Sequence, residues 1–411
     1  MGISSIKSVY AWNRNGPDRV NGCTKAQAVV SYGRAKWISA GLIAGLIYVL
    51  LAVSSQAEPI RIATYNTELK RRGPGLLLRD ILSGKDEQIL AVAGIITHIS
   101  PDILLLNGID YDYNNAALNA FADLLADQGA PYPHRFALLP NTGMGTGLDM
   151  DGDGQLGGPR DAQGYGRFAG QGGMAILSRY PIDALRVQDF SALKWVDFPQ
   201  ALLPQVDGKP FPTPQAQSEQ RLSTTGHWIV PVTTPDGDIN LLAFHATPPV
   251  FDGPEDRNGK RNHDEVRFWA AYLDGELGTK PTGAPFVILG DANLDPFDGD
   301  GQGKAIRDLL AHPMVQDAKP QSEGAVAATG IQSGANTHHK GDPAQDTVDW
   351  KDVPGPGNMR VDYVLPSIDL TIFNSGVFWP KADSPDVALL SVGGTLASRH
   401  HLVWVDVIAQ R

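Results

Sequence analysis

Two polar residues directly after an apolar run are the best placed in this chain to carry out chemistry. The run 286–289 (FVIL) ends at Gly290, and Asp291, Ala292 and Asn293 follow. A short apolar run that ends in glycine predicts a strand buried on both faces, and side chains alternate along it, so Asp291 and Asn293 share one side. A carboxylate beside an amide can orient a water molecule and hold a phosphoryl oxygen. The alternative is an Asx turn that closes the strand.

Polar residues recur at other strand ends. Asn66 closes the predicted strand 60–66, His245 closes 241–244, and Asp362 lies within the run 360–364. The segment Ser398-Arg399-His400 precedes a last apolar run. Each has a simpler reading, since Asn66 could cap a turn, His245 could be a loop histidine and Asp362 could be a surface charge. Their order along the chain favours a shared site.

This ordered set, from Tyr65-Asn66 to His400, resembles the endonuclease/exonuclease/phosphatase superfamily with its deoxyribonuclease-I-like fold. The strand 173–179 (GMAILSR) is also typical of that family. The resemblance implies an exported, bacterial-type member that hydrolyses a phosphoester with a divalent metal. Asp291 would then orient and deprotonate the attacking water, and Asn293 would hold that water or a non-bridging phosphoryl oxygen.

The resemblance also implies roles for the remaining residues. His400, oriented by Asp362, would stay cationic and stabilise the charge of the transition state. His245 would contact the phosphate or protonate the leaving oxygen. Asn66 would lie beside Mg²⁺ or Mn²⁺, which neutralises and polarises the phosphate.

Two positions depart from the family pattern. Gly108 stands where relatives place a glutamate that binds the metal, and Arg399 stands where many relatives carry an aspartate. Glu68 and Asp110 are candidate replacement metal ligands, and Arg399 could grip a phosphate through two hydrogen bonds. We expect Gly108→Glu to tighten metal binding, with a loss of stability if the backbone there needs a positive φ.

A second metal site is suggested by acidic residues at alternate positions. Asp149, Asp151 and Asp153 are followed by a glycine at the sixth position, as at the start of a calcium loop, so Ca²⁺ is a candidate ligand. The twelfth position holds Arg160 instead of the glutamate that such loops require. A plain series of Asp-Gly turns is the alternative.

Apolar periodicity predicts the elements that carry these residues. Strands are predicted at 60–66, 103–106, 174–179, 227–232, 239–244, 286–289, 361–365 and 402–407, and helices at 86–99, 114–127 and 261–277. Polar insertions are predicted near 141–173, 199–217 and 318–358. Their irregular alternation predicts an α/β sandwich of two packed mixed sheets flanked by helices, formed by one domain over 58–411.

The first 57 residues read as an export signal. Residues 37–53 are almost entirely apolar, the preceding segment carries six Lys or Arg against Asp18, and Ser55-Gln56-Ala57 offers a cleavage site. We predict a signal peptide over 1–57 with a long basic n-region, a secreted or periplasmic protein, and no membrane span after cleavage. An uncleaved anchor is the alternative. The single cysteine, Cys23, precedes the cleavage site.

The charge balance bears on the substrate. Six of the 34 Lys and Arg and one of the 45 acidic residues lie in the first 57 positions, so the remainder has a formal net charge of −16. A negative surface opposes nucleic acid binding. The best candidate basic patch, Lys70-Arg71-Arg72, also reads as a solvated turn. We expect a monomer acting on a small phosphoester; the alternatives are a secreted nuclease and a non-catalytic member with an impaired metal site.

Overall fold

The computed structural model describes residues 58–281, 283 and 285–409. The predicted signal peptide lies outside these residues. Within the described part of the chain, no helix is long and apolar enough to cross a membrane.

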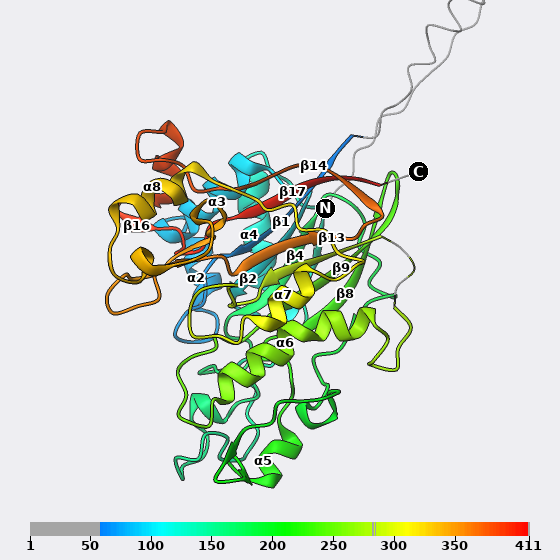
Figure 1. The fold of residues 1–411 in the computed structure, drawn as a ribbon. Coiled ribbons are helices and arrows are strands. Elements are labelled where there is room, and N and C mark those ends of the chain that lie inside the picture. The colour runs from blue at the N-terminus through cyan, green and yellow to red at the C-terminus, as the bar shows by residue number, and fades with distance from the viewer. Residues whose placement is uncertain (1–57, 282, 284, 410–411) are drawn as a thin grey trace, which may run out of the picture. The chain divides into compact units, whose positions relative to one another are not determined.

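Two large mixed sheets form the centre of the domain (Figure 1). The first has the strand order β14-β17-β1-β2-β4-β3, with bounds Leu370–Val377, Val403–Ala409, Ile60–Asn66, Ile103–Ile109, Gly173–Ser178 and His134–Phe136. The second has the order β13-β10-β9-β8-β5, with bounds Asp362–Pro366, Phe286–Asp291, Gly237–His245, His227–Thr234 and Gln188–Asp189. Parallel pairs occur in both sheets, β1 with β2 and β9 with β10.

Side chains that alternate along the strands build three apolar cores. Ile62 and Leu105 of the first sheet share the inner core with Leu241 and Val287 of the second. The opposite faces are covered by helices: α3 (Glu87–Ile99) and α4 (Ala116–Asp127) cover the first sheet, and α6 (Arg257–Leu273) and α7 (Lys304–Leu310) cover the second. The strands therefore lie between two helical layers, and the predicted α/β sandwich is confirmed.

Several predicted boundaries were wrong for identifiable reasons. Helix α6 begins at Arg257, four residues before the predicted start, because its first turn is polar and gives no apolar periodicity. The predicted loop 199–217 contains β6 (Gln205–Val206), β7 (Lys209–Pro210) and the start of α5 (Pro214–Glu219). The insertion 318–358 contains α8 (Glu323–Ile331), β11 (Val348–Asp349) and the start of β12 (Asn358–Met359). Helix α2 (Leu76–Ser83), helix α7 and strand β14 were not predicted at all.

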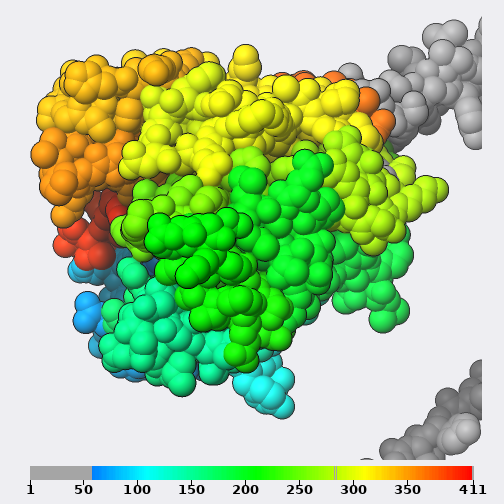
Figure 2. Space-filling view, turned by 60° about the horizontal axis from the view of Figure 1, so that its bottom comes forward, coloured from blue at the N-terminus to red at the C-terminus, as the bar shows by residue number. Residues whose placement is uncertain are grey.

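The insertions stand at the surface of the domain. Figure 2 shows the insertion 318–358 in orange and the segment 141–217 in teal to green, with red C-terminal and blue N-terminal segments between them. The short β15 (Ser391–Val392) and β16 (Thr395–Leu396) form a hairpin shortly before His400. The C-terminal segment thus reaches the functional residues just before β17 begins.

Candidate active site

Strand alternation points four of the predicted residues toward the same space between the sheets. On β1, Asn66 is separated from the inward-facing Ile62 by an even number of positions, so both side chains point to the same face. On β10, the same holds for Asp291 and the inward-facing Val287. His245 and Asp362 continue the inner-facing positions of β9 and β13. Register completes the arrangement, because Asp291 pairs with His245 on one side and with Asp362 on the other.

The strand β10 approaches β9 very closely just before Asp291. A Cβ atom at Gly290 would lie 1.9 Å from the carbonyl oxygen of Phe244, so only glycine fits there. Asp291 is fully buried, and its Oδ2 accepts a hydrogen bond from Asn66 Nδ2 at 2.8 Å. The missing side chain at Gly290 thus lets the carboxylate be held between the two sheets.

Asn293 binds Asp291 from the other side. Its backbone amide donates to Asp291 Oδ1 at 2.8 Å, and its Nδ2 donates to Oδ2 at 3.2 Å and to the carbonyl of Ala246 at 2.9 Å. Asn293 has a φ of 47°, a left-handed conformation that asparagine tolerates better than most residues. Burial, together with the nearby charge of Asp362, raises the pKa of Asp291. A carboxylate with a raised pKa is a stronger base.

His400 is held as a cation by a buried aspartate. Its Nδ1 lies 2.9 Å from Asp362 Oδ2, and its Nε2 lies 4.0 Å from Asp291 Oδ2. Burial alone would lower the pKa of His400, but the charges of Asp362 and Asp291 outweigh it and raise the pKa to about 9. Thr347 donates its hydroxyl to the same Asp362 oxygen at 3.0 Å. We call Asp291, Asn293, Asp362 and His400 the catalytic cluster.

His245 lies beside this cluster in its neutral form. Its Nε2 is 3.4 Å from Asp291 Oδ2, and within the described chain its buried Nδ1 has no hydrogen-bond partner. Burial and the positive charges of Lys70 and His400 lower the pKa of His245 to about 3. A neutral imidazole suits contact with a phosphate oxygen better than protonation of a leaving group. His401 faces away, stacked on Trp379 with ring centroids 3.9 Å apart.

Beside the cluster, two other predicted residues, Glu68 and Arg399, form an ion pair. The Arg399 Nε donates to Glu68 Oε1 at 3.0 Å, and its backbone amide donates to Oε2 at 3.0 Å. Ser398 ties this pair to the cluster, since its hydroxyl donates to the carbonyl of Asn66 at 2.7 Å and accepts from the His400 amide at 3.1 Å. We call Asn66, Glu68 and Arg399 the cation edge.

The cation edge has the oxygen donors that a divalent metal prefers. Asn66 Oδ1 accepts the backbone amide of Glu68 at 3.2 Å, and the Ser398 hydroxyl bonds both the Asn66 carbonyl and, at 3.3 Å, Glu68 Oε2. Arg399 outweighs the opposing effect of burial and lowers the pKa of Glu68 to about 2, so the carboxylate is ionised. Carboxylate and amide oxygens suit Mg²⁺ or Mn²⁺. Asn66 and Glu68 therefore offer the oxygen types that such an ion prefers.

The replaced glutamate position is shaped by backbone geometry. Gly108 has a φ of 71°, and a Cβ there would lie 2.5 Å from Asn66 Oδ1. Asp110 is buried and engaged elsewhere, because its carboxylate accepts the amides of Arg71 and Gly172, both at 2.8 Å. The structure therefore brings Glu68, and not Asp110, next to Asn66.

The acidic series in the first insertion also comes together. The carboxylate oxygens of Asp149, Asp151 and Asp153 lie within 4.8 Å of one another and could hold a cation. Asp149 accepts the amides of Gly152 and Gly154, at 2.6 and 2.9 Å. Arg160, at the position where a calcium loop needs glutamate, lies 3.9 Å from Asp151.

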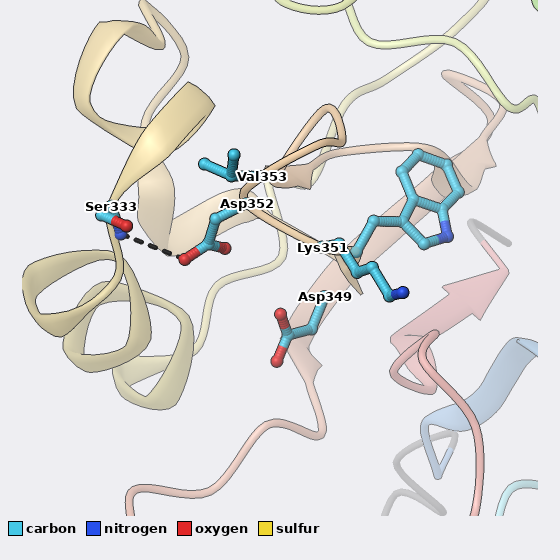
Figure 3. Close-up of a pocket in the computed structure, with 6 residues that line it drawn as sticks. Ser333, Asp349, Lys351, Asp352 and Val353 are labelled. Atoms are coloured by element: carbon cyan, nitrogen blue, oxygen red, sulfur yellow. Dashed lines mark hydrogen bonds between the residues drawn. The ribbon is translucent and has the colours of Figure 1, made fainter.

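A shallow hollow, whose lining residues are drawn in Figure 3, adjoins the catalytic cluster through Trp350. It has a volume of about 490 Å³ and is lined by Ser333, Asp349, Trp350, Lys351, Asp352 and Val353. The Trp350 ring meets the His400 ring edge-on, with centroids 5.7 Å apart. The amide of Asp349 donates to the carbonyl of Arg399 at 2.9 Å. The hollow therefore begins where the cluster ends.

Sequence reasoning missed three residues that support the site. Thr347 holds Asp362 from within a polar insertion that gave no signal. Ser398 had a signal, its place in the Ser-x-His segment, although no role was assigned to it. Asn107 is fully buried and pairs with Asn66 in the β1–β2 ladder, and its Nδ2 donates to Thr64 Oγ1 at 3.2 Å. Asn107 lies two residues after the inward-facing Leu105, so strand alternation could have predicted that its side chain points toward the site.

Comparison with known proteins identifies the family of the chain. Residues 63–400 match the model of the Endonuclease/Exonuclease/phosphatase family. No curated protein matches the chain.

Solved structures of low sequence identity are also similar to this chain. An endonuclease/exonuclease/phosphatase from Beutenbergia cavernae has 17% identity and a TM-score of 0.50, with 86% of this chain and 72% of that chain covered. A mannosyl-6-phosphatase from Bacteroides thetaiotaomicron has 14% identity and a TM-score of 0.44, covering 85% and 99%. A beta toxin mutant from Staphylococcus aureus with bound magnesium ions has 12% identity and a TM-score of 0.42, covering 85% and 99%.

Proposed function

Because the chain belongs to the endonuclease/exonuclease/phosphatase family, whose members are hydrolases of phosphoester bonds, we propose that it is a divalent-metal-dependent phosphoesterase. The observation that carries this proposal is the catalytic cluster. A buried carboxylate with a raised pKa lies 4.0 Å from an imidazole with a raised pKa, and each is fixed by its own hydrogen bonds. A base and a cation held this close suit attack of water on a phosphoester.

The residues divide the chemistry between them. Asp291 accepts the proton of the attacking water, and Asn293 and Asn66 keep its carboxylate oriented. His400 supplies positive charge to the phosphoryl oxygens, while Asp362 preserves that charge. Neutral His245 contacts the phosphate. Asn66 and Glu68 would hold a Mg²⁺ or Mn²⁺ ion, which neutralises the phosphate and polarises it when bound.

The surface beside the cluster favours a small phosphoester over a nucleic acid. Asp349 and Asp352 line the hollow next to Trp350, and a second phosphate group placed there would meet carboxylates. Arg71, in the predicted basic patch, is already paired with Asp80 and Asp86. A neutral leaving group that packs on an aromatic ring suits this surface better than a polyanion.

An activity panel tests the proposal. The purified protein is assayed with Mg²⁺ or Mn²⁺ against sugar phosphates, nucleotides, phospholipids and duplex DNA, with Asp291→Ala as the blank. We expect metal-dependent hydrolysis of a small phosphoester that the blank lacks. Hydrolysis of DNA alone would point to a nuclease. No hydrolysis by a correctly folded, metal-loaded protein would point to a non-catalytic member.

Two further features belong to this proposal. We propose export to the periplasm or the medium, with cleavage after Ala57; mass spectrometry of the mature protein should find Glu58 at its N-terminus. We also propose Ca²⁺ as the cation at Asp149, Asp151 and Asp153, which calcium titration of Asp151→Asn and the wild type would test.

A further inference from the structure

The carboxylate of Glu68 has two oxygens with different surroundings. Oε2 accepts the backbone amide of Arg399 at 3.0 Å and the Ser398 hydroxyl at 3.3 Å, and Arg399 Nε reaches it at 3.2 Å. Among the described residues, Oε1 is bonded only by the Arg399 guanidinium, through Nε and Nη2. The backbone and Ser398 would therefore keep Glu68 in place if the guanidinium moved away, and Oε1 would become free.

The guanidinium is on the more exposed side chain of this pair. The side chain of Arg399 is 54% exposed, whereas that of Glu68 is 17% exposed. Ion pairs with such an exposed partner contribute little net stability, because solvent screens their attraction. A second cation with a higher charge can therefore displace the guanidinium from Oε1.

Asn66, whose Oδ1 accepts the backbone amide of Glu68, supplies a second candidate oxygen ligand. A divalent ion at the cation edge would need Oε1, and Arg399 already occupies it.

We propose that Arg399 is an internal competitor of the divalent metal for Glu68. The guanidinium neutralises Glu68 in the metal-free protein and is released to solvent, toward the substrate phosphate, when the metal binds. Arg399 thus weakens the affinity for the metal alone. This inference rests on the proposed function, because it takes Glu68 and Asn66 as the metal ligands.

Manganese binding without substrate tests the competition directly. Free Mn²⁺ is measured by electron paramagnetic resonance during titration of the full chain, for the wild type, Arg399→Gln, Glu68→Gln and the double variant. Arg72→Gln is the matched control, since it removes one exposed positive charge from the segment that follows Glu68. Circular dichroism and thermal unfolding check that each variant is folded.

We expect Arg399→Gln to bind Mn²⁺ about fivefold more tightly than the wild type, as loss of a weak competing ion pair predicts. Arg72→Gln should stay within about twofold. Glu68→Gln should bind more weakly, and in that background Arg399→Gln should give no gain, because the contested oxygen is gone.

Two results would overturn the inference while leaving the metal site in place. One is unchanged affinity in Arg399→Gln; the other is a gain that persists in the Glu68→Gln background, which would show a general charge effect. If no folded variant binds Mn²⁺ and hydrolysis continues in a chelator, metal dependence itself fails, and the competition fails with it.

Discussion

The catalytic cluster and the cation edge lie side by side but differ in burial and in bonding. Asp291, Asp362 and His400 are almost completely buried, and each is held by groups on neighbouring strands or segments. Glu68 instead lies just after β1, and Arg399 lies shortly before β17. Their ion pair is at the surface, where the Arg399 side chain is exposed. Buried charges that are paired keep fixed positions, whereas exposed pairs exchange partners easily. The comparison separates a preorganised reaction centre from an adjustable binding edge.

Asp291→Asn should have the largest effect on activity, because it removes the general base of the catalytic cluster. We expect kcat to fall on the order of a thousandfold, within the range for loss of a general base. Thermal unfolding should stay cooperative, since the amide is nearly isosteric and removes a buried charge. Steady-state kinetics on the substrate found in the panel provide the measurement. A variant that keeps a tenth of the activity would contradict the assigned role.

Asp362→Asn should act through His400 and cost on the order of a hundredfold in kcat. In the metal-free wild type, the pKa of His400 is raised to about 9, so protonation of His400 stabilises the fold below its ordinary pKa of 6.5. That contribution is lost as the pH rises through 9. The variant should therefore lose less stability than the wild type between these pH values.

Nuclear magnetic resonance of the imidazole protons measures this pKa directly in both proteins. The His400 resonance should titrate near pH 9 in the wild type and at a clearly lower pH in Asp362→Asn. Equal values in the two proteins would mean that Asp362 does not hold the charge, and the contrast between the two halves of the site would weaken.

Gly108→Glu tests whether the cation edge can be returned to the family pattern. The backbone there has a positive φ and the new Cβ would meet Asn66, so the structure reverses the sequence-based expectation of tighter metal binding: we expect no tighter binding and a fall of roughly 1–2 kcal/mol in the free energy of unfolding. Gly129→Glu is the control, since Gly129 also has a positive φ but open space around it. Denaturant unfolding and Mn²⁺ titration measure both effects. Tighter binding in the folded variant would show that the edge readily accepts the glutamate.

Trp350→Ala should have the smallest effect, because the hollow adjoins the catalytic cluster without joining it. We expect KM for a small phosphoester to rise about three- to tenfold, as for loss of one aromatic contact, with kcat nearly unchanged. Trp350→Phe should recover most of the affinity. Kinetics that show a fall in kcat instead would place Trp350 among the groups that hold His400.

The sequence was sufficient for most of the fold because apolar runs and their alternation set the strands. Spacing from Val287 and from Ile62 already aims Asp291 and Asn66 toward one space, and the structure brings them together. The ion pair of Glu68 and Arg399 could not be predicted, since each is a single charge in a polar turn, 331 positions apart. Helix α8 was missed because its small residues give little amphipathic signal.

Thr347 gives the second large insertion a meaning beyond its surface position. Its hydroxyl bonds Asp362 at 3.0 Å and its carbonyl accepts the amide of His401 at 2.7 Å, while all but one of the residues that line the hollow, 349–353, follow shortly after it. The insertion is thus attached to the site at Thr347, and residues 350–357 extend beyond that point. Substitution of residues 350–357, by evolution or by protein engineering, could change the accepted substrate while the reaction centre keeps its charge, provided that Thr347 is retained.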